Sequence, residues 1–105
     1  MLPFREKIIE ENETYILVQR DFMSTLIEED LNWHMDEEDR DVFVVEGDGW
    51  YLQIENKIPQ LMQKESIFKI PKETWHRIIN KNGTNLIINV RKYKWIVYLD
   101  NLSMK

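Results

Sequence analysis

The sequence predicts an all-β domain, built as a sandwich or a barrel. Strand-like segments of about four to seven residues recur at a spacing of roughly ten residues, which is typical of these architectures. Short turn signals such as Gly47-Asp48-Gly49 and Asn82-Gly83 separate some of the segments. No strongly helical segment alternates with the strands, so a parallel sheet with crossover helices is not expected. At 105 residues, the chain is expected to form a single domain over residues 1–105.

The first third of the chain gives the weakest pattern. Residues 1–13 are rich in charge and fit either a short helix or an edge strand. Residues 15–18 form an apolar, partly β-branched run that predicts a strand. Residues 22–31 contain apolar side chains at helical spacing, but their central part also fits a strand. We favour a strand or an irregular turn for this segment.

From residue 40 onward the apolar residues recur with a period close to two. Residues 41–46 and 50–55 are predicted strands, and glycine and aspartate between them predict a hairpin turn. The remaining predicted strands are shorter or less regular and cover residues 60–63, 67–70, 74–80, 86–90 and 93–99. The basic and then apolar C-terminal segment is expected to be an edge strand or a contact with a second copy of the chain.

Composition excludes several functional classes. The chain has no cysteine, so neither a disulfide framework nor a thiolate metal site is available. The net charge of −5 argues against nucleic-acid binding, which needs a basic surface. No apolar stretch approaches the length of a membrane span, and the charged N-terminus does not resemble a signal peptide. We therefore expect a cytoplasmic protein whose partner is a small molecule, without contact to nucleic acid or membrane.

Two segments carry the histidines of the chain. The first, over about residues 34–47, places His34 two residues before Asp36 and ends in glycine. Such spacing puts both side chains on the same face of a strand. The second, over about residues 65–80, places His76 five residues after Pro71. His76 is expected to join the other two residues from a neighbouring strand.

Over about residues 33–91 these segments resemble the two motifs of the cupin family. The second motif is Gly-x5-Pro-x-Gly-x2-His-x3-Asn, and this chain keeps its proline, histidine and asparagine while Glu65 and Glu73 stand at the two glycine positions. The first motif is Gly-x5-His-x-His-x3-4-Glu-x6-Gly. Counted back from Gly47, Arg40 stands at its glutamate position and Asp36 at its second histidine.

The resemblance implies a double-stranded β-helix, or jelly-roll, barrel. Cupins of this kind usually bind a divalent metal through three histidines and one glutamate, and homodimers are common among them. The resemblance therefore implies a metal site on His34, Asp36 and His76. Two histidines and one carboxylate suit Fe²⁺ and leave positions open for substrate and oxygen, while Mn²⁺, Ni²⁺ and Zn²⁺ are alternatives.

Arg40 decides between several interpretations of this site. If it faces inward, it is a candidate catalytic residue that orients a substrate carboxylate. Alternatively it neutralises Asp36, both histidines are only hydrogen-bonded, and no metal binds. In a third interpretation a local bulge turns Asp39 or Asp41 inward as the carboxylate ligand.

Two functional hypotheses follow from these interpretations. The first is a metal-dependent enzyme, dioxygenase-like or an isomerase, that acts on a small organic acid. The second is a metal-free barrel that binds a sugar or a carboxylate, or that has a regulatory or structural role. Fold alone does not decide between them.

The tryptophans predict which residues line the barrel. Trp33 and Trp75 each precede a histidine, so strand alternation points them away from the histidine face. The better candidates for lining the interior lie in the predicted strand at residues 50–55 and are Trp50, Leu52, Gln53 and Ile54.

Overall fold

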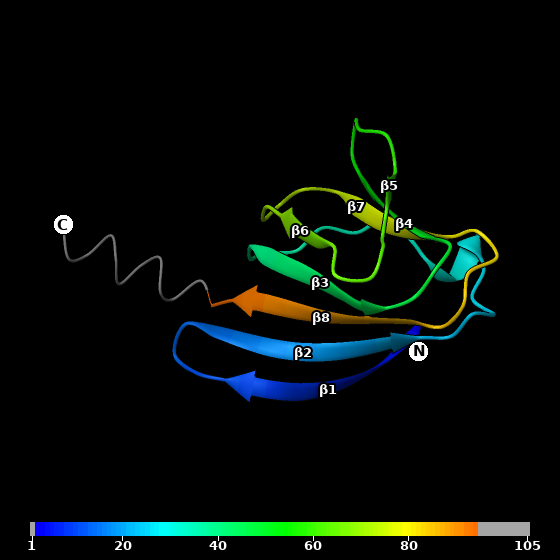
Figure 1. Cartoon of the computed structure of the whole chain (residues 1–105). Coiled ribbons are helices and arrows are strands. Elements are labelled where there is room, and N and C mark those ends of the chain that lie inside the picture. Colours follow the sequence, from blue (N-terminus) through cyan, green and yellow to red (C-terminus); the bar gives the residue numbers. More distant parts are fainter. Residues whose placement is uncertain (1, 95–105) are drawn as a thin grey trace.

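The computed structural model describes residues 2–94 and has an all-β architecture (Figure 1). A single 3-10 turn, η1 (Glu28–Asp30), is the helical element within this range, and no helix there is long and apolar enough to cross a membrane. The strands, in chain order, are β1 (Phe4–Glu11), β2 (Tyr15–Phe22), β3 (Arg40–Glu46), β4 (Trp50–Ile54), β5 (Gln60–Leu61), β6 (Ile67–Ile70), β7 (His76–Asn80) and β8 (Leu86–Tyr93).

The strands form two antiparallel sheets. A five-stranded sheet has the order β1-β2-β8-β3-β6, and a three-stranded sheet has the order β5-β4-β7. Figure 1 shows β4, β5 and β7 lying together on one side of β3 and β8. Successive strands of the chain repeatedly change sheet, so residues far apart in sequence meet between the two layers.

The hydrophobic core fills the space between the sheets. Alternate residues of β8 are buried, as expected for a strand with one face toward the core. Trp50 is fully buried, packs against Phe22 with ring centroids 6.0 Å apart, and donates from Nε1 to the carbonyl of Thr84 at 2.7 Å. The buried apolar residues are Val18, Phe22, Leu31, Val42, Val44, Trp50, Leu52, Met62, Ile70, Leu86, Ile88 and Val90.

The turn at residues 47–49 differs from the predicted hairpin. β3 pairs with β6 and β8, whereas β4 pairs with β5 and β7, so this turn carries the chain from one sheet to the other. Gly49 has φ +78°, and a Cβ there would lie 2.7 Å from the Cα of Gly83. Glycine is needed at this point because two turns touch through their backbones.

Most of the other predicted elements are confirmed. The N-terminal segment is an edge strand rather than a helix, and residues 23–31 form an irregular turn that contains η1. The strand predicted over residues 74–80 begins at His76, because the preceding residues form a turn in which Glu73 has φ +57°. β8 extends beyond the predicted 86–90 to Tyr93. The strand predicted over 93–99 lies largely outside the described residues.

Candidate metal and ligand site

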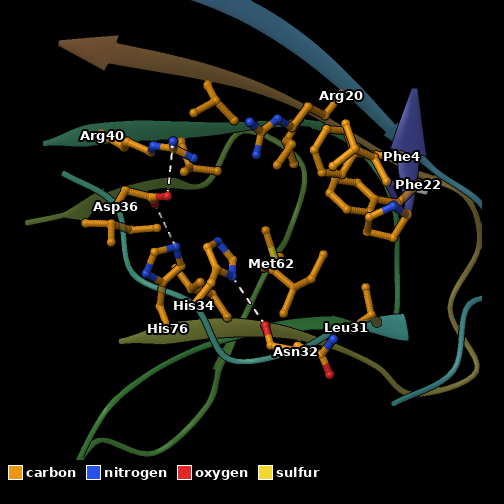
Figure 2. A pocket seen from close by; sticks show the side chains of 18 of the residues that line it. Phe4, Arg20, Phe22, Leu31, Asn32, His34, Asp36, Arg40, Met62 and His76 are labelled. Carbon is orange, nitrogen blue, oxygen red and sulfur yellow. Dashed lines mark hydrogen bonds and ion pairs between the residues drawn. The ribbon is translucent and has the colours of Figure 1, made fainter. Parts of the chain in front are cut away.

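A cavity of about 330 Å³ lies between the two sheets (Figure 2). Its walls are mostly apolar, with contributions from Val42 of β3, Leu52 of β4 and Ile78 of β7. The volume is at the lower end of the range for small-molecule sites. The polar and charged side chains that reach this cavity are Arg20, Asp30, Asn32, His34, Asp36, Arg40 and His76.

The two histidines are held side by side through the backbone. His34 forms an isolated antiparallel bridge with His76, in which each residue's N–H donates to the other's carbonyl, at 3.0 and 2.9 Å. The two rings lie edge to face with their centroids 4.2 Å apart. His34 and Asp36 therefore lie in an irregular extended segment, not in the regular strand that the spacing predicted. The carbonyl of Asp36 accepts a further hydrogen bond from the backbone N–H of Glu73 at 2.7 Å.

Hydrogen bonds to the backbone determine how each ring presents its nitrogens. Nδ1 of His76 lies 2.9 Å from the carbonyl of Thr74, and Nδ1 of His34 lies 3.3 Å from the carbonyl of Asn32. A carbonyl oxygen only accepts, so Nδ1 carries the proton in both rings. In the neutral rings Nε2 then bears a lone pair, which is the arrangement found in metal-ligating histidines.

Asp36 contributes a buried oxygen that lacks a hydrogen bond. Its Oδ2 lies 3.3 Å from Nε2 of His76 but has no hydrogen-bond partner among the described residues. Because Nδ1 of His76 carries the ring proton, Nε2 of the neutral ring turns a lone pair toward a lone pair of Asp36 Oδ2. A proton or a cation between these two atoms removes the repulsion. One ligand atom from each of His34, Asp36 and His76 can be chosen so that all lie within 4.8 Å of one another. This donor set fits a divalent cation.

Arg40, the first residue of β3, faces the cavity. Its Nη2 lies 3.1 Å from Oδ1 of Asp36, and both Nη2 and Nε donate to Oε1 of Glu38, at 2.8 and 3.1 Å. The bond to Asp36 uses Oδ1 and leaves Oδ2 directed to His76. Arg40 therefore positions the Asp36 carboxylate.

The bulge that would turn Asp39 or Asp41 inward is absent from the described residues, so that interpretation is wrong. Asp41 accepts from the Tyr93 hydroxyl at 2.7 Å and lies 3.4 Å from Lys69 Nζ, on the face of β3 opposite to Arg40. Asp39 accepts from the backbone N–H of Lys72 at 2.8 Å, which ties the segment before β3 to the turn before β7.

Burial and neighbouring charges shift the pKa values of two of these groups. Desolvation, followed by the neighbouring His76, lowers the pKa of His34. Burial acts to raise the pKa of Asp36. The hydrogen bond that Asp36 accepts when Nε2 of His76 carries a proton, followed by the Arg40 guanidinium, outweighs burial and holds that pKa below its ordinary value. Both shifts favour the deprotonated forms, which are the forms that bind metal.

We expect the metal-free protein to lose stability as the pH falls below about 6.5, the ordinary pKa of histidine. The pKa of His34 is lowered in the folded state, so the unfolded chain binds more protons at such pH values. The pKa of Asp36 is also lowered, but its contribution is lost only at much more acidic pH. Denaturant titrations with chelator at about pH 7.5 and about pH 5.5 measure the effect.

The matched control for this pH effect is His34→Asn. This variant should show a smaller loss of stability between the two pH values than the wild type does. An equal loss in both proteins would assign the effect to other groups.

Comparison with solved structures identifies the architecture. No protein-family model and no curated protein matches the chain. An RmlC-like cupin family protein with a double-stranded β-helix fold, from Methanocaldococcus jannaschii, aligns with a TM-score of 0.72 and 15% identity, over 95% of this chain and 88% of that one. The chain has the cupin fold. KdgF from Halomonas sp. aligns with a TM-score of 0.70 and 18% identity, over 88% of this chain and 82% of that one.

The predicted cupin-type barrel is therefore confirmed, and the predicted site residues converge within it. Figure 2 shows Asp36 between Arg40 and His76, with His34 beside His76. Asn80, the last residue of the second motif, lies outside this group. It donates to the carbonyls of Ser24 and Leu26, at 2.9 Å each, and so fastens the irregular segment to β7.

The tryptophan predictions are partly right. Trp33 and Trp75 lie outside the cupin barrel and are partly exposed, as alternation predicted. Leu52 lines the cavity and Trp50 is buried beside it, but Ile54 is not among the lining residues. Gln53 lies on the outer face with Trp33 and Trp75, so its predicted inward position is wrong.

Arg20 is a cavity residue that the sequence analysis did not find. It lies on β2, which contributes nothing to either cupin motif. Val18 and Phe22 on the same strand are both buried, and Arg20 is two residues from each. The alternation along β2 could therefore have predicted that Arg20 faces the interior, because residues two apart on a strand share a face.

Proposed function

We propose that the chain is a small cupin protein that binds a divalent metal through His34, Asp36 and His76 and acts on a small organic acid in the cavity. The observation that carries this proposal is the buried Oδ2 of Asp36, which has no hydrogen-bond partner among the described residues and faces Nε2 of His76. The pairing of each histidine Nδ1 with a backbone carbonyl supports it, because each Nε2 is then available to a metal.

The donor set suggests the class of reaction. Two nitrogens and one oxygen suit Fe²⁺, with Mn²⁺, Ni²⁺ and Zn²⁺ as alternatives. When bound, the metal would polarise a ligand oxygen and keep positions open for small molecules. We propose a dioxygenase-like reaction, with isomerase chemistry as the alternative.

The protein's own contribution is the positioning of the ligands beside an apolar cavity. Arg40 holds Asp36 through Oδ1, and apolar side chains such as Val42 and Ile78 line the same cavity. The sequence also predicts that Arg40 orients a substrate carboxylate. This remains a prediction, because Glu38 and Asp36 engage its Nε and Nη2.

A second candidate is a metal-free barrel that binds a small carboxylate. The ion pair between Arg40 and Asp36 favours it, because a neutralised carboxylate attracts a cation less strongly. The homodimer and the cytoplasmic location expected from the sequence also remain predictions.

The test is metal content by mass spectrometry on protein purified without chelators, followed by calorimetric titration with Mn²⁺. We expect near-stoichiometric metal in the wild type and a loss of affinity of about a hundredfold or more in Asp36→Asn and His76→Ala, because each removes a ligand. Asp41→Asn is the matched control, since Asp41 is also a buried, ion-paired carboxylate but lies outside the cavity. It should bind metal like the wild type.

Two results would contradict the metal site. One is a wild type that contains no metal and takes up none in the titration. The other is an Asp36→Asn variant that binds metal as tightly as Asp41→Asn does. Either result would favour the metal-free barrel.

A further inference from the structure

Arg20 is a second arginine in the cavity, and it comes from the five-stranded sheet as Arg40 does. Figure 2 shows its guanidinium group between Arg40 and the Phe4 and Phe22 rings, across the cavity from His76. The Arg20 side chain is 13% exposed, and its guanidinium carbon lies 4.2 Å from the centroid of the Phe4 ring. This contact holds the planar group in place. Burial lowers the pKa of Arg20 and Glu6 acts in the opposite direction, but a guanidinium stays charged at neutral pH.

The hydrogen bonds of Arg20 leave part of the guanidinium available to a ligand. Its Nε donates to Oε2 of Glu6 at 2.7 Å. Within residues 2–94, its terminal nitrogens make no hydrogen bond to another residue. These nitrogens are the planar pair that binds a carboxylate with two parallel hydrogen bonds.

The charges around the cavity are close to balanced, so a bound metal would leave an excess of positive charge that favours an anionic ligand. Glu6 also lies 3.8 Å from Lys92, so one carboxylate faces two cations. Arg40 is balanced by Asp36 and Glu38. A divalent cation on the histidines and Asp36 would add positive charge to this balanced set, and an anionic ligand would offset it.

Apart from Arg20 and the polar group around Asp36, the cavity is lined mostly by apolar side chains. Those that come from the two sheets include Val42, Leu52, Ile70, Ile78, Ile88 and Val90. Hydrocarbon atoms of a ligand lose no hydrogen bonds against such a surface, whereas polar atoms would. The site therefore favours a ligand with a short hydrocarbon segment between its polar groups.

We propose that Arg20 binds a carboxylate of the ligand, while a second oxygen-bearing group of the same ligand occupies the metal site. The ligand class is a short organic acid with two acidic groups, or with one acid and one further oxygen donor. This inference rests on the proposed function, because it places one end of the ligand at the metal. It assigns the binding of the other end to Arg20, which lies outside both cupin motifs.

The experiment measures metal and ligand binding separately by calorimetry. Mn²⁺ is titrated first, and then malonate, succinate and glutarate are titrated into the Mn²⁺-loaded protein, with malonamide as the uncharged probe. The variants are Arg20→Gln and Arg20→Lys. The matched control is Arg77→Gln, because Arg77 likewise lies over an aromatic ring, that of Trp33, and hydrogen-bonds through Nε, but it lies outside the cavity.

We expect at least one dicarboxylate to bind the loaded wild type and malonamide not to bind. Arg20→Gln should weaken the dicarboxylate by about tenfold or more, as expected for the loss of a charge-assisted pair of hydrogen bonds. Arg20→Lys should recover part of that loss, and Arg77→Gln should bind like the wild type. Mn²⁺ affinity should be the same in all four proteins, which shows that the variants are folded.

Three results would overturn the inference while leaving the metal site intact. They are equal dicarboxylate binding by Arg20→Gln and the wild type, equal binding of malonamide and malonate, and no binding by any dicarboxylate. If the wild type takes up no Mn²⁺, the proposed function fails and the same panel is applied to the metal-free protein. Binding that Arg20→Gln removes would then support the carboxylate contact, and no binding would overturn it.

Discussion

Replacing Trp50 by alanine is expected to lower the free energy of unfolding by about 3–5 kcal/mol. Trp50 is 0% exposed and lies on β4 where the two sheets meet. Its loss would leave a large cavity, unpair the Thr84 carbonyl that accepts from Nε1, and remove the contact with Phe22. Equilibrium unfolding in urea, followed by circular dichroism, measures the change.

Trp75→Ala provides the matched control for this effect. Trp75 is 42% exposed, on the outer face of the same three-stranded sheet. Its removal should cost about 1 kcal/mol or less, because a large part of its surface is already in contact with solvent and little core packing is lost. A similar loss in both variants would show that the outer tryptophan is covered in solution, for example by a second copy of the chain.

Replacing Arg40 by methionine is expected to destabilise the metal-free protein by about 2–3 kcal/mol. Arg40 and Asp36 are only 12% and 13% exposed, so removal of the cation leaves a nearly buried carboxylate without its partner. Breaking a fully buried pair costs about 3–5 kcal/mol. We expect a smaller cost here, because Glu38, the second partner of Arg40, has a side chain that is 23% exposed and can be hydrated once Arg40 is removed. Urea unfolding in the presence of chelator gives the value.

A double-mutant cycle separates this ion pair from other effects of the substitution. The combination of Arg40→Met with Asp36→Asn should be more stable than Arg40→Met alone, because it removes the unpaired charge as well. The control is Arg77→Met, whose partner Glu28 is mostly exposed, and it should cost about 0.5 kcal/mol or less from that pair. If Asp36→Asn gives no recovery, the cost of Arg40→Met comes from packing rather than charge.

The sequence was sufficient to predict the fold and the central group of the site. Strand-length apolar runs predicted the strands, and the resemblance of two segments to the cupin motifs implied that His34, Asp36 and His76 lie together, although they are up to 42 residues apart in sequence. The prediction that His34 and Asp36 lie on a regular strand was wrong, since His34 belongs to an isolated bridge. A period-two pattern gives the face of a residue, but it does not distinguish a full strand from an extended segment that is held by a few isolated hydrogen bonds.

Residues outside the motifs were harder to predict, because their position depends on how the sheets are assembled. Arg20 reaches the cavity because β2 pairs with β8, and this pairing is not encoded in the spacing around either histidine. The path of the chain at the turn of residues 47–49 also depends on how the sheets are assembled. Glycines there predict a sharp reversal, but whether the two strands pair or separate into different sheets depends on contacts with residues 81–84.

The attachment of the segment at residues 23–39 connects local unfolding to the retention of a bound ion. This segment carries His34 and Asp36 but contains no strand. It is fastened by Asn80 near its start, by the His34–His76 bridge, and by hydrogen bonds from the backbone N–H groups of Glu73 and Lys72 to Asp36 and Asp39. A metal held by His34, Asp36 and His76 would cross-link the segment to β7 and close a loop whose ordering costs conformational entropy. Opening of the segment and escape of the ion would then be one event, so the residence time of the ion would be limited by the rate of that opening.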